Sequence, residues 1–117
     1  MKRDALPEIW CVWGDRGDYE ERRQWVVECI TTNAWADARV EQLNALVRGM
    51  REELGKIDDR YPNRSDNDDA GNEQWDRWER ARKRLDAKYR RLAGDPDLES
   101  DASYSCVAVP LRSWALA

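Results

Sequence analysis

Between Ala36 and Ile57, apolar residues recur at alternating intervals of four and three positions. The series is Ala36, Val40, Leu43, Val47, Met50, Leu54 and Ile57. Residues at these intervals form one stripe along a helix, so we predict a helix over residues 33–57. The segment 31–33 (Thr-Thr-Asn) can cap its first turn. The stripe must be covered by other elements or by a second copy, so a monomer and a homodimer are both open.

A second helix is predicted over residues 73–92, beginning near Asn72 and ending before Gly94, a residue type common just past a helix. Its narrower stripe comprises Trp75, Trp78, Ala81, Leu85, Tyr89 and Leu92. The stretch 58–72 holds Pro62, Gly71 and several Asp and Asn residues, which predicts a loop between the two helices. The acidic residues 95–101 predict a linker after the second helix.

Three segments have the composition of strands. Residues 8–13 and 24–30 are rich in β-branched and aromatic side chains, and the polar connection between them holds two glycines. We therefore predict a hairpin in which Trp25, Val27 and Cys29 share a face. A third strand is predicted over residues 103–111, where Pro110 restricts it to a strand end or a sheet edge.

The predicted order of elements is β-β-α-α-β. This order favours an α+β fold, in which a small antiparallel three-stranded sheet packs on a two-helix hairpin and the third strand pairs with the first. The length of 117 residues favours a single domain over residues 1–117. Phenylalanine is absent and tryptophan occurs seven times, so we expect tryptophans to anchor the core.

Targeting and redox features are few. The longest apolar run is far shorter than the roughly 20 residues of a membrane helix, and no apolar signal core follows Met1. We therefore expect a cytoplasmic protein with no membrane contact. The three cysteines are Cys11, Cys29 and Cys106, an odd and widely spaced set that predicts reduced, buried thiols.

Catalytic and metal chemistry is poorly represented. The chain has no histidine, which excludes imidazole-based catalysis and His-bearing zinc sites, and it has no CxxC pair. The segment 66–71 resembles a calcium loop, but Ala70 and Arg77 stand where the loop needs oxygen ligands. The Arg-Gly-Asp run at 16–18 and the absence of a glycine-rich phosphate loop add no function. We therefore predict no enzyme activity, no metal and no cofactor.

Charge is distributed unevenly along the chain. Residues 77–91 carry eight basic and two acidic side chains, while the whole chain has a net charge of −4. Five of these bases share one face of the predicted helix: Arg77, Arg80, Arg84, Lys88 and Arg91. With Trp78 as an aromatic anchor, this face predicts a site for phosphate or for an acidic protein surface. The alternative is a solvated face with no partner.

An acidic surface is the competing candidate for a partner site. It comprises Asp58, Asp59, Asp66, Asp68, Asp69 and the linker 95–101. Clustered carboxylates can imitate the phosphates of a nucleic acid and so occupy a basic groove of a partner. The choice between the basic and the acidic surface stays open at this point.

The first forty-odd residues resemble small phage and prophage proteins. The resemblance lies in Glu-Ile-Trp-Cys-Val-Trp-Gly at 8–14, Gly-Asp-Tyr-Glu-Glu-Arg-Arg at 17–23, Trp-Val-Val-Glu-Cys-Ile-Thr-Thr at 25–32 and the helix ending Leu-Asn-Ala-Leu-Val at 43–47. The run Tyr-Ser-Cys-Val-Ala-Val-Pro-Leu at 104–111 is similar to their final strand. The resemblance covers about half of the chain and implies a mobile-element setting, but no catalytic residue. Anti-CRISPR inhibitors are the familiar proteins of this kind.

Two functional hypotheses follow. The first is a non-enzymatic accessory protein that binds a host protein complex, such as a CRISPR effector, and blocks or modulates it by steric and electrostatic occlusion. The second is a nucleic-acid-binding accessory protein that uses the basic second helix. The overall acidity, with a pI near 4.9, favours the first, because dedicated duplex binders are usually basic as domains.

Overall fold

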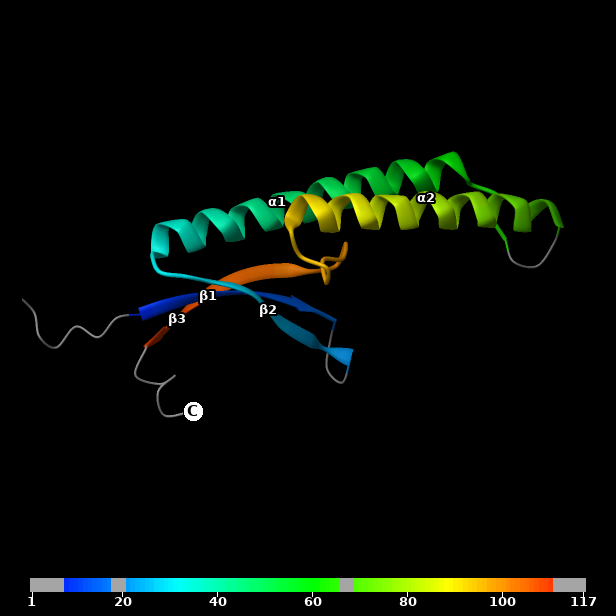
Figure 1. Cartoon of the computed structure of the whole chain (residues 1–117). Coiled ribbons are helices and arrows are strands. Elements are labelled where there is room, and N and C mark those ends of the chain that lie inside the picture. The colour runs from blue at the N-terminus through cyan, green and yellow to red at the C-terminus, as the bar shows by residue number, and fades with distance from the viewer. Residues whose placement is uncertain (1–7, 18–20, 66–68, 111–117) are drawn as a thin grey trace, which may run out of the picture. The chain divides into compact units, whose positions relative to one another are not determined.

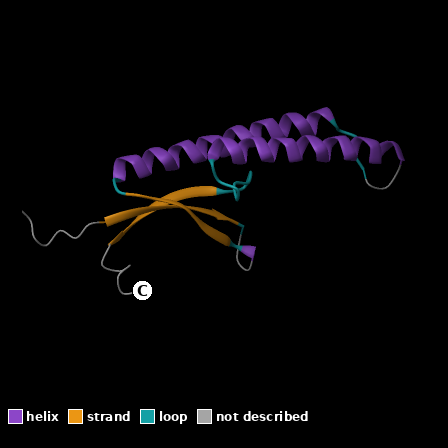
Figure 2. Cartoon of the chain, in the orientation of Figure 1, coloured by secondary structure: helices purple, strands orange, loops and turns teal. Residues whose placement is uncertain are grey.

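The structure is a computed structural model that describes residues 8–17, 21–65 and 69–110. The elements in chain order are β1 (Glu8–Arg16), β2 (Arg23–Ile30), α1 (Asn33–Arg60), α2 (Asp69–Ala93) and β3 (Ser103–Pro110). Figure 2 distinguishes the helices from the strands by colour. The strands form one antiparallel sheet in the order β2-β1-β3, so the predicted α+β class and the pairing of the third strand with the first are confirmed.

The chain divides into two compact units. The first, here called the sheet unit, spans Met1–Asn44 and Asp101–Ala117, and the second, the helical unit, spans Ala45–Ser100. Helix α1 contributes its first residues to the sheet unit and its remainder to the helical unit. The single-domain assignment of residues 1–117 stays a prediction. No described helix is long and apolar enough to cross a membrane.

Helix α1 begins at a threonine cap and packs its first turns on the sheet. The hydroxyl of Thr32 accepts the backbone amide of Trp35 at 3.4 Å, which satisfies a free donor of the first turn as predicted. Ala36, Leu43 and Val12 of β1 are completely buried in this unit. The Asn44 side chain accepts the amide of Tyr104 at 2.9 Å and donates to its carbonyl at 3.0 Å. These two bonds hold the helix against the edge strand β3 (Figure 1).

Strand β2 contains a bulge that overturns one prediction. Val12 pairs with Glu28 but Trp13 pairs with Val26, so Val27 has no partner on β1. An extra residue reverses the alternation of side chains beyond it. Consequently Cys29, opposite Cys11, and Trp25, opposite Gly14, lie on opposite faces, and the expectation that they share a face was wrong.

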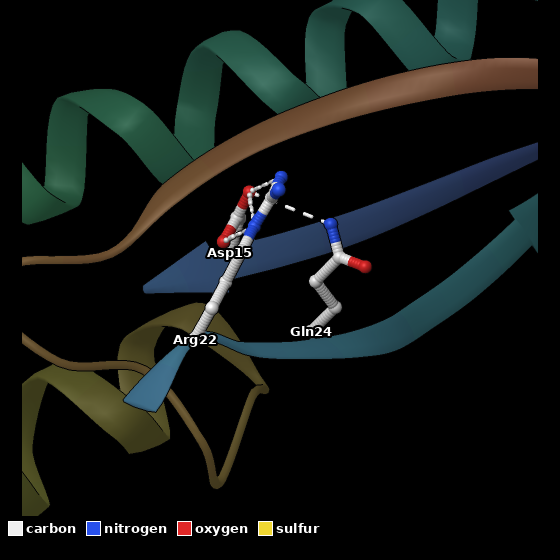
Figure 3. Close-up of polar contacts among 3 residues, drawn as sticks. All are labelled: Asp15, Arg22 and Gln24. Atoms are coloured by element: carbon white, nitrogen blue, oxygen red, sulfur yellow. Dashed lines mark hydrogen bonds and ion pairs between the residues drawn. The ribbon is translucent and has the colours of Figure 1, made fainter. Parts of the chain in front are cut away.

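Trp25 occupies space that only a glycine leaves. A Cβ at Gly14 would lie 2.4 Å from the ring of Trp25, far inside van der Waals contact. The ring also meets Tyr104 edge to face, with centroids 6.0 Å apart. On the other face of the hairpin, the Asp15 carboxylate accepts hydrogen bonds from Nε and Nη2 of Arg22, the shorter at 2.6 Å (Figure 3). It also accepts one from the side-chain amide of Gln24 at 3.5 Å.

In the helical unit both helices are longer than predicted. Helix α1 continues to Arg60 instead of ending at residue 57, and α2 begins at Asp69 instead of 73, so the predicted loop 58–72 is wrong at both ends. The guanidinium of Arg64 donates to the carbonyls of Asp58 and Tyr61, which satisfies acceptors at the end of α1.

The end of α2 is held by a glycine turn. Gly94 has a φ of 65°, and the amides of Gly94 and Asp95 bond back to the carbonyls of Arg91 and Arg90. This is the Schellman arrangement, so the predicted stop at Gly94 is confirmed. Beyond it Leu98 is completely buried, and Arg90 donates to its carbonyl at 3.0 Å. The predicted acidic linker is therefore an ordered turn that adds to the core.

Several predictions about burial need correction. None of the tryptophans among the described residues is in the buried core, which consists of smaller side chains with Tyr89 and Tyr104. Leu92 is 54% exposed, and Ala93, four residues after Tyr89, takes the buried position instead. All three cysteines are free thiols, but only Cys11 is buried, since Cys29 is exposed and Cys106 is half-buried. The stripe of α1 is confirmed, with Ala36, Leu43, Val47, Met50 and Ile57 all buried.

Candidate anion-binding groove

A groove runs between the C-terminal part of α1 and helix α2, which lie side by side in opposite directions within the helical unit (Figure 1). One part of it encloses about 320 Å³ and the adjoining part about 240 Å³. Both parts are lined by Arg60, Ala81 and Arg84, so they form one continuous feature, here called the basic groove. The remaining lining residues are Glu53, Lys56, Ile57, Tyr61, Arg77, Arg80, Leu85 and Lys88.

The groove exists because a small residue interrupts the apolar stripe of α2. Ala81 stands one helical turn before Leu85, and its methyl group leaves space that a leucine would fill. Ile57 from α1 and Leu85 from α2 are both buried and supply an apolar floor. Long basic side chains from both helices form the rim above this floor. An apolar floor below charged groups suits a partner surface with both apolar and anionic parts.

The lining carries six cationic side chains and one acidic one. The cations are Lys56, Arg60, Arg77, Arg80, Arg84 and Lys88, and the acid is Glu53. Glu53 is already engaged, because Lys88 Nζ lies 3.3 Å from its Oε1. The Tyr89 hydroxyl, and secondarily Lys88, holds the pKa of Glu53 below its usual range. Burial, with a smaller contribution from Glu53, raises the pKa of Tyr89 to about 12.

The cations differ in how firmly they are held. Arg77 Nη2 lies 2.9 Å from Glu73 in an exposed pair one turn away, which is a weak interaction. Arg80 donates through Nε to the backbone carbonyl of Asp76 at 3.3 Å. Because a carbonyl carries no net charge, this bond does not neutralise the guanidinium of Arg80. Within the described part of the chain, Arg60 and Arg84 form no ion pair. These two residues line both parts of the groove and are available to an anion.

Trp78 lies outside the groove and has partners of its own. Its indole Nε1 donates to Asp58 Oδ1 at 2.7 Å, and its ring lies 4.8 Å from that of Trp75. The guanidinium groups of Arg64 and Arg82 lie 4.8 Å and 4.7 Å from the Trp78 ring centroid. Trp78 therefore holds the loop after α1 against α2. Its predicted role as a partner anchor stays untested.

The other predicted site residues do not gather at the groove. Arg91 is exposed near the end of α2 and does not line it. Asp66 and Asp68 lie outside the described residues, and Asp69 is the first residue of α2. Of the wider acidic surface, Asp58 bonds to Trp78, and Asp95 is 97% buried with Oδ1 accepting the amide of Asp97 at 3.0 Å. The acidic surface is thus partly used within the fold.

Sequence reasoning found four of the six groove cations and missed Lys56 and Arg60. The four on α2 follow from helical spacing alone. Lys56 precedes and Arg60 follows Ile57, the last residue of the α1 stripe. If the two helices are assumed to pack through their stripes, this position near Ile57 predicts that both cations lie beside α2. In the described part of the chain no cluster of acidic, cysteine or histidine side chains could hold a metal ion.

No family model, curated protein or solved structure matches this chain significantly. Among its features, the basic groove combines a defined shape with a strong excess of one charge, and this combination favours recognition of an anionic surface.

Proposed function

We propose that this protein is a non-enzymatic binding protein whose basic groove docks onto an anionic surface of a macromolecular complex. The observation that carries the proposal is the lining of six cations around one acid that Lys88 and Tyr89 already engage. Four of the six are arginines, whose planar guanidinium groups bind carboxylates or phosphates through two parallel hydrogen bonds. Arg60 and Arg84 are the central contacts in this proposal.

The favoured partner is a protein complex with an acidic surface. The chain as a whole carries a net charge of −4, so a long polyanion is repelled by the remainder of the molecule while it is attracted by the groove. A compact acidic patch that fits the groove avoids this repulsion. The resemblance to phage proteins implies the setting: a host defence or nucleic-acid-processing complex in the host cytoplasm, such as a CRISPR effector. Binding then blocks or modulates that complex by occupying a surface.

The test is a pull-down of the tagged protein from a host lysate with and without nuclease treatment. A stoichiometric protein partner that survives nuclease supports the proposal. The double variant Arg80→Glu with Arg84→Glu should lose that partner, because two attractions become repulsions. Arg48→Glu with Lys83→Glu is the matched control: both double variants change the net charge from −4 to −8, but Arg48 and Lys83 lie outside the groove. Equal loss in both variants would contradict a role for the groove.

Nucleic acid is the second candidate, and the row of cations along α2 favours it. A single strand that contacts four cations would release counterions, so its log affinity should fall by roughly 0.7 per neutralised phosphate for each tenfold rise in salt. Titration of a fluorescent oligonucleotide at several salt concentrations measures this slope. A slope near zero, or a captured partner that persists after nuclease, removes this candidate.

A further inference from the structure

Two cysteines face each other on the sheet unit. Cys11 of β1 and Cys29 of β2 are direct partners in the antiparallel register, and their Sγ atoms lie 3.5 Å apart in a thiol–thiol hydrogen bond. Cys11 is 7% exposed, whereas Cys29 is exposed to solvent. One thiol is therefore open to a reagent in solution and the other is held behind it, which is the arrangement of a reacting and a resolving cysteine.

The backbone places this pair within reach of a covalent bond. Directly opposite residues of antiparallel strands have Cα atoms about 4.5 to 5.5 Å apart. Disulfides accept Cα separations of about 4.4 to 6.8 Å, so rotation of the two side chains suffices and the strands need not move. Cys106 is not part of this pair. It lies opposite Val12 on the other face of the sheet, and its thiol donates to Asp37 Oδ1 at 3.4 Å.

We propose that Cys11 and Cys29 are an oxidative modification site, at which a small-molecule disulfide of the glutathione class converts the two thiols into an intramolecular disulfide. The Cys29 thiolate attacks one sulfur of the reagent, which forms a mixed disulfide and releases one glutathione thiolate. The Cys11 thiolate then attacks the Cys29 sulfur and releases the second. The protein loses two electrons and two protons, and the reagent gains them as two thiols.

The environments of the two thiols set the order of these steps. Burial, followed by the contact with Cys29, raises the pKa of the Cys11 thiol, which disfavours its thiolate and makes Cys11 the slower of the two to attack a reagent. The exposed Cys29 is consequently the first to react. The new bond would join the two strands of the hairpin across the 18 positions that separate Cys11 and Cys29, and it would restrict the unfolded chain.

The experiment treats the reduced Cys106→Ser variant with glutathione disulfide. The expected product has no free thiol and a mass about 2 Da lower than the reduced protein, with a peptide map that joins Cys11 to Cys29. Its urea midpoint should lie above that of the reduced form, and dithiothreitol should reverse both changes. A lasting glutathione adduct on Cys29, two unreacted thiols or a disulfide-linked dimer would each overturn the proposal.

Single cysteine variants separate the two steps. With Cys106→Ser retained, Cys11→Ser should stop at a stable glutathione adduct on Cys29. The variant Cys29→Ser should react many times more slowly, because only the buried thiol remains. Cys29 is exposed, so its substitution should leave the fold intact even if Cys11→Ser disturbs packing. Equal reaction rates of the two variants would show that the exposed thiol has no special role and would contradict the proposal.

Discussion

The two units of the molecule use their arginines differently. In the sheet unit each described arginine has a partner within the unit: Arg16 pairs with Asp101, Arg22 with Asp15 and Arg39 with Glu28, and Arg23 lies over the ring of Trp25. In the helical unit Arg60 and Arg84 form no ion pair with any described residue. Every described arginine of the sheet unit is therefore engaged within that unit, whereas Arg60 and Arg84 of the helical unit are available to a partner, which is why we place the proposed binding function in the helical unit.

The largest expected effect tests whether the turn after α2 is part of the core that supports the charged helices of the helical unit. Leu98 is completely buried in the turn after α2, whereas Leu92 on the last turn of α2 is 54% exposed. Leu98→Ala should lower the free energy of unfolding by about 3 kcal/mol, because it leaves a cavity. Leu92→Ala should change it by less than about 0.5 kcal/mol. Urea denaturation followed by tryptophan fluorescence measures both, and equal effects would show that the turn is not part of the core.

A pair of glycines, one in each unit, should respond to alanine with opposite signs. At Gly14 the new methyl group would meet the Trp25 ring at 2.4 Å, so we expect a loss of about 1 to 3 kcal/mol in stability. At Gly55, in the interior of helix α1, a Cβ would meet no atom within 4 Å. Alanine there should stabilise the protein by about 0.5 to 1 kcal/mol through the unfolded chain. The same urea measurement serves both, and stabilisation by Gly14→Ala would contradict the position of Trp25.

The Tyr89–Glu53 hydrogen bond is a third test, confined to the helical unit. Tyr89→Phe should cost about 1 kcal/mol at neutral pH, because it removes a donor to a carboxylate beside the groove. The pKa of Tyr89 is about 12 in the folded state, against 10 for an ordinary tyrosine. Because the unfolded chain loses this proton first, the contribution of Tyr89 to the free energy of unfolding is complete below pH 10 and is lost as pH rises toward 12. The phenylalanine variant should lose less stability over that interval. Urea midpoints from pH 9 to 12 for both proteins give the comparison.

The spacing of residues within each helix predicted both helices well. The features that the sequence did not predict depend on which elements pair with each other in the fold. The α1 stripe and the basic face of α2 follow from helical spacing, so Leu43, Met50, Arg80 and Arg84 could be placed from the sequence. The bulge at Val27 depends on how β2 registers against β1, which strand composition does not encode.

Burial after α2 and the second side of the groove were missed for a related reason. Leu98 becomes buried only through the turn that begins at Gly94, and in sequence it is one leucine among acids. Arg60 faces the groove only because α1 runs three residues beyond Ile57 and lies beside α2. Such features depend on the pairing of elements distant in sequence, while the spacing of residues within one helix does not.

The smallest expected effect tests the comparison between the units directly. Arg22 gives the largest contribution that holds the pKa of Asp15 below its usual value of 3.8 (Figure 3). A lowered pKa stabilises the folded state above pH 3.8, and this stabilisation is lost as pH falls through the folded-state pKa. Asp15→Asn should therefore lower the urea midpoint slightly at pH 7, and the difference from wild type should shrink below pH 3.8.

Arg84→Gln is the counterpart of Asp15→Asn in the helical unit. It removes a cation that has no acidic partner among the described residues and several cationic neighbours along the groove, so relief of repulsion should leave the urea midpoint unchanged or slightly higher. The difference from wild type should decrease with added salt, which screens exposed charges. If Arg84→Gln instead destabilised the protein as Asp15→Asn does, Arg84 would stabilise its own unit. The contrast between arginines held within the sheet unit and arginines available in the helical unit would then fail.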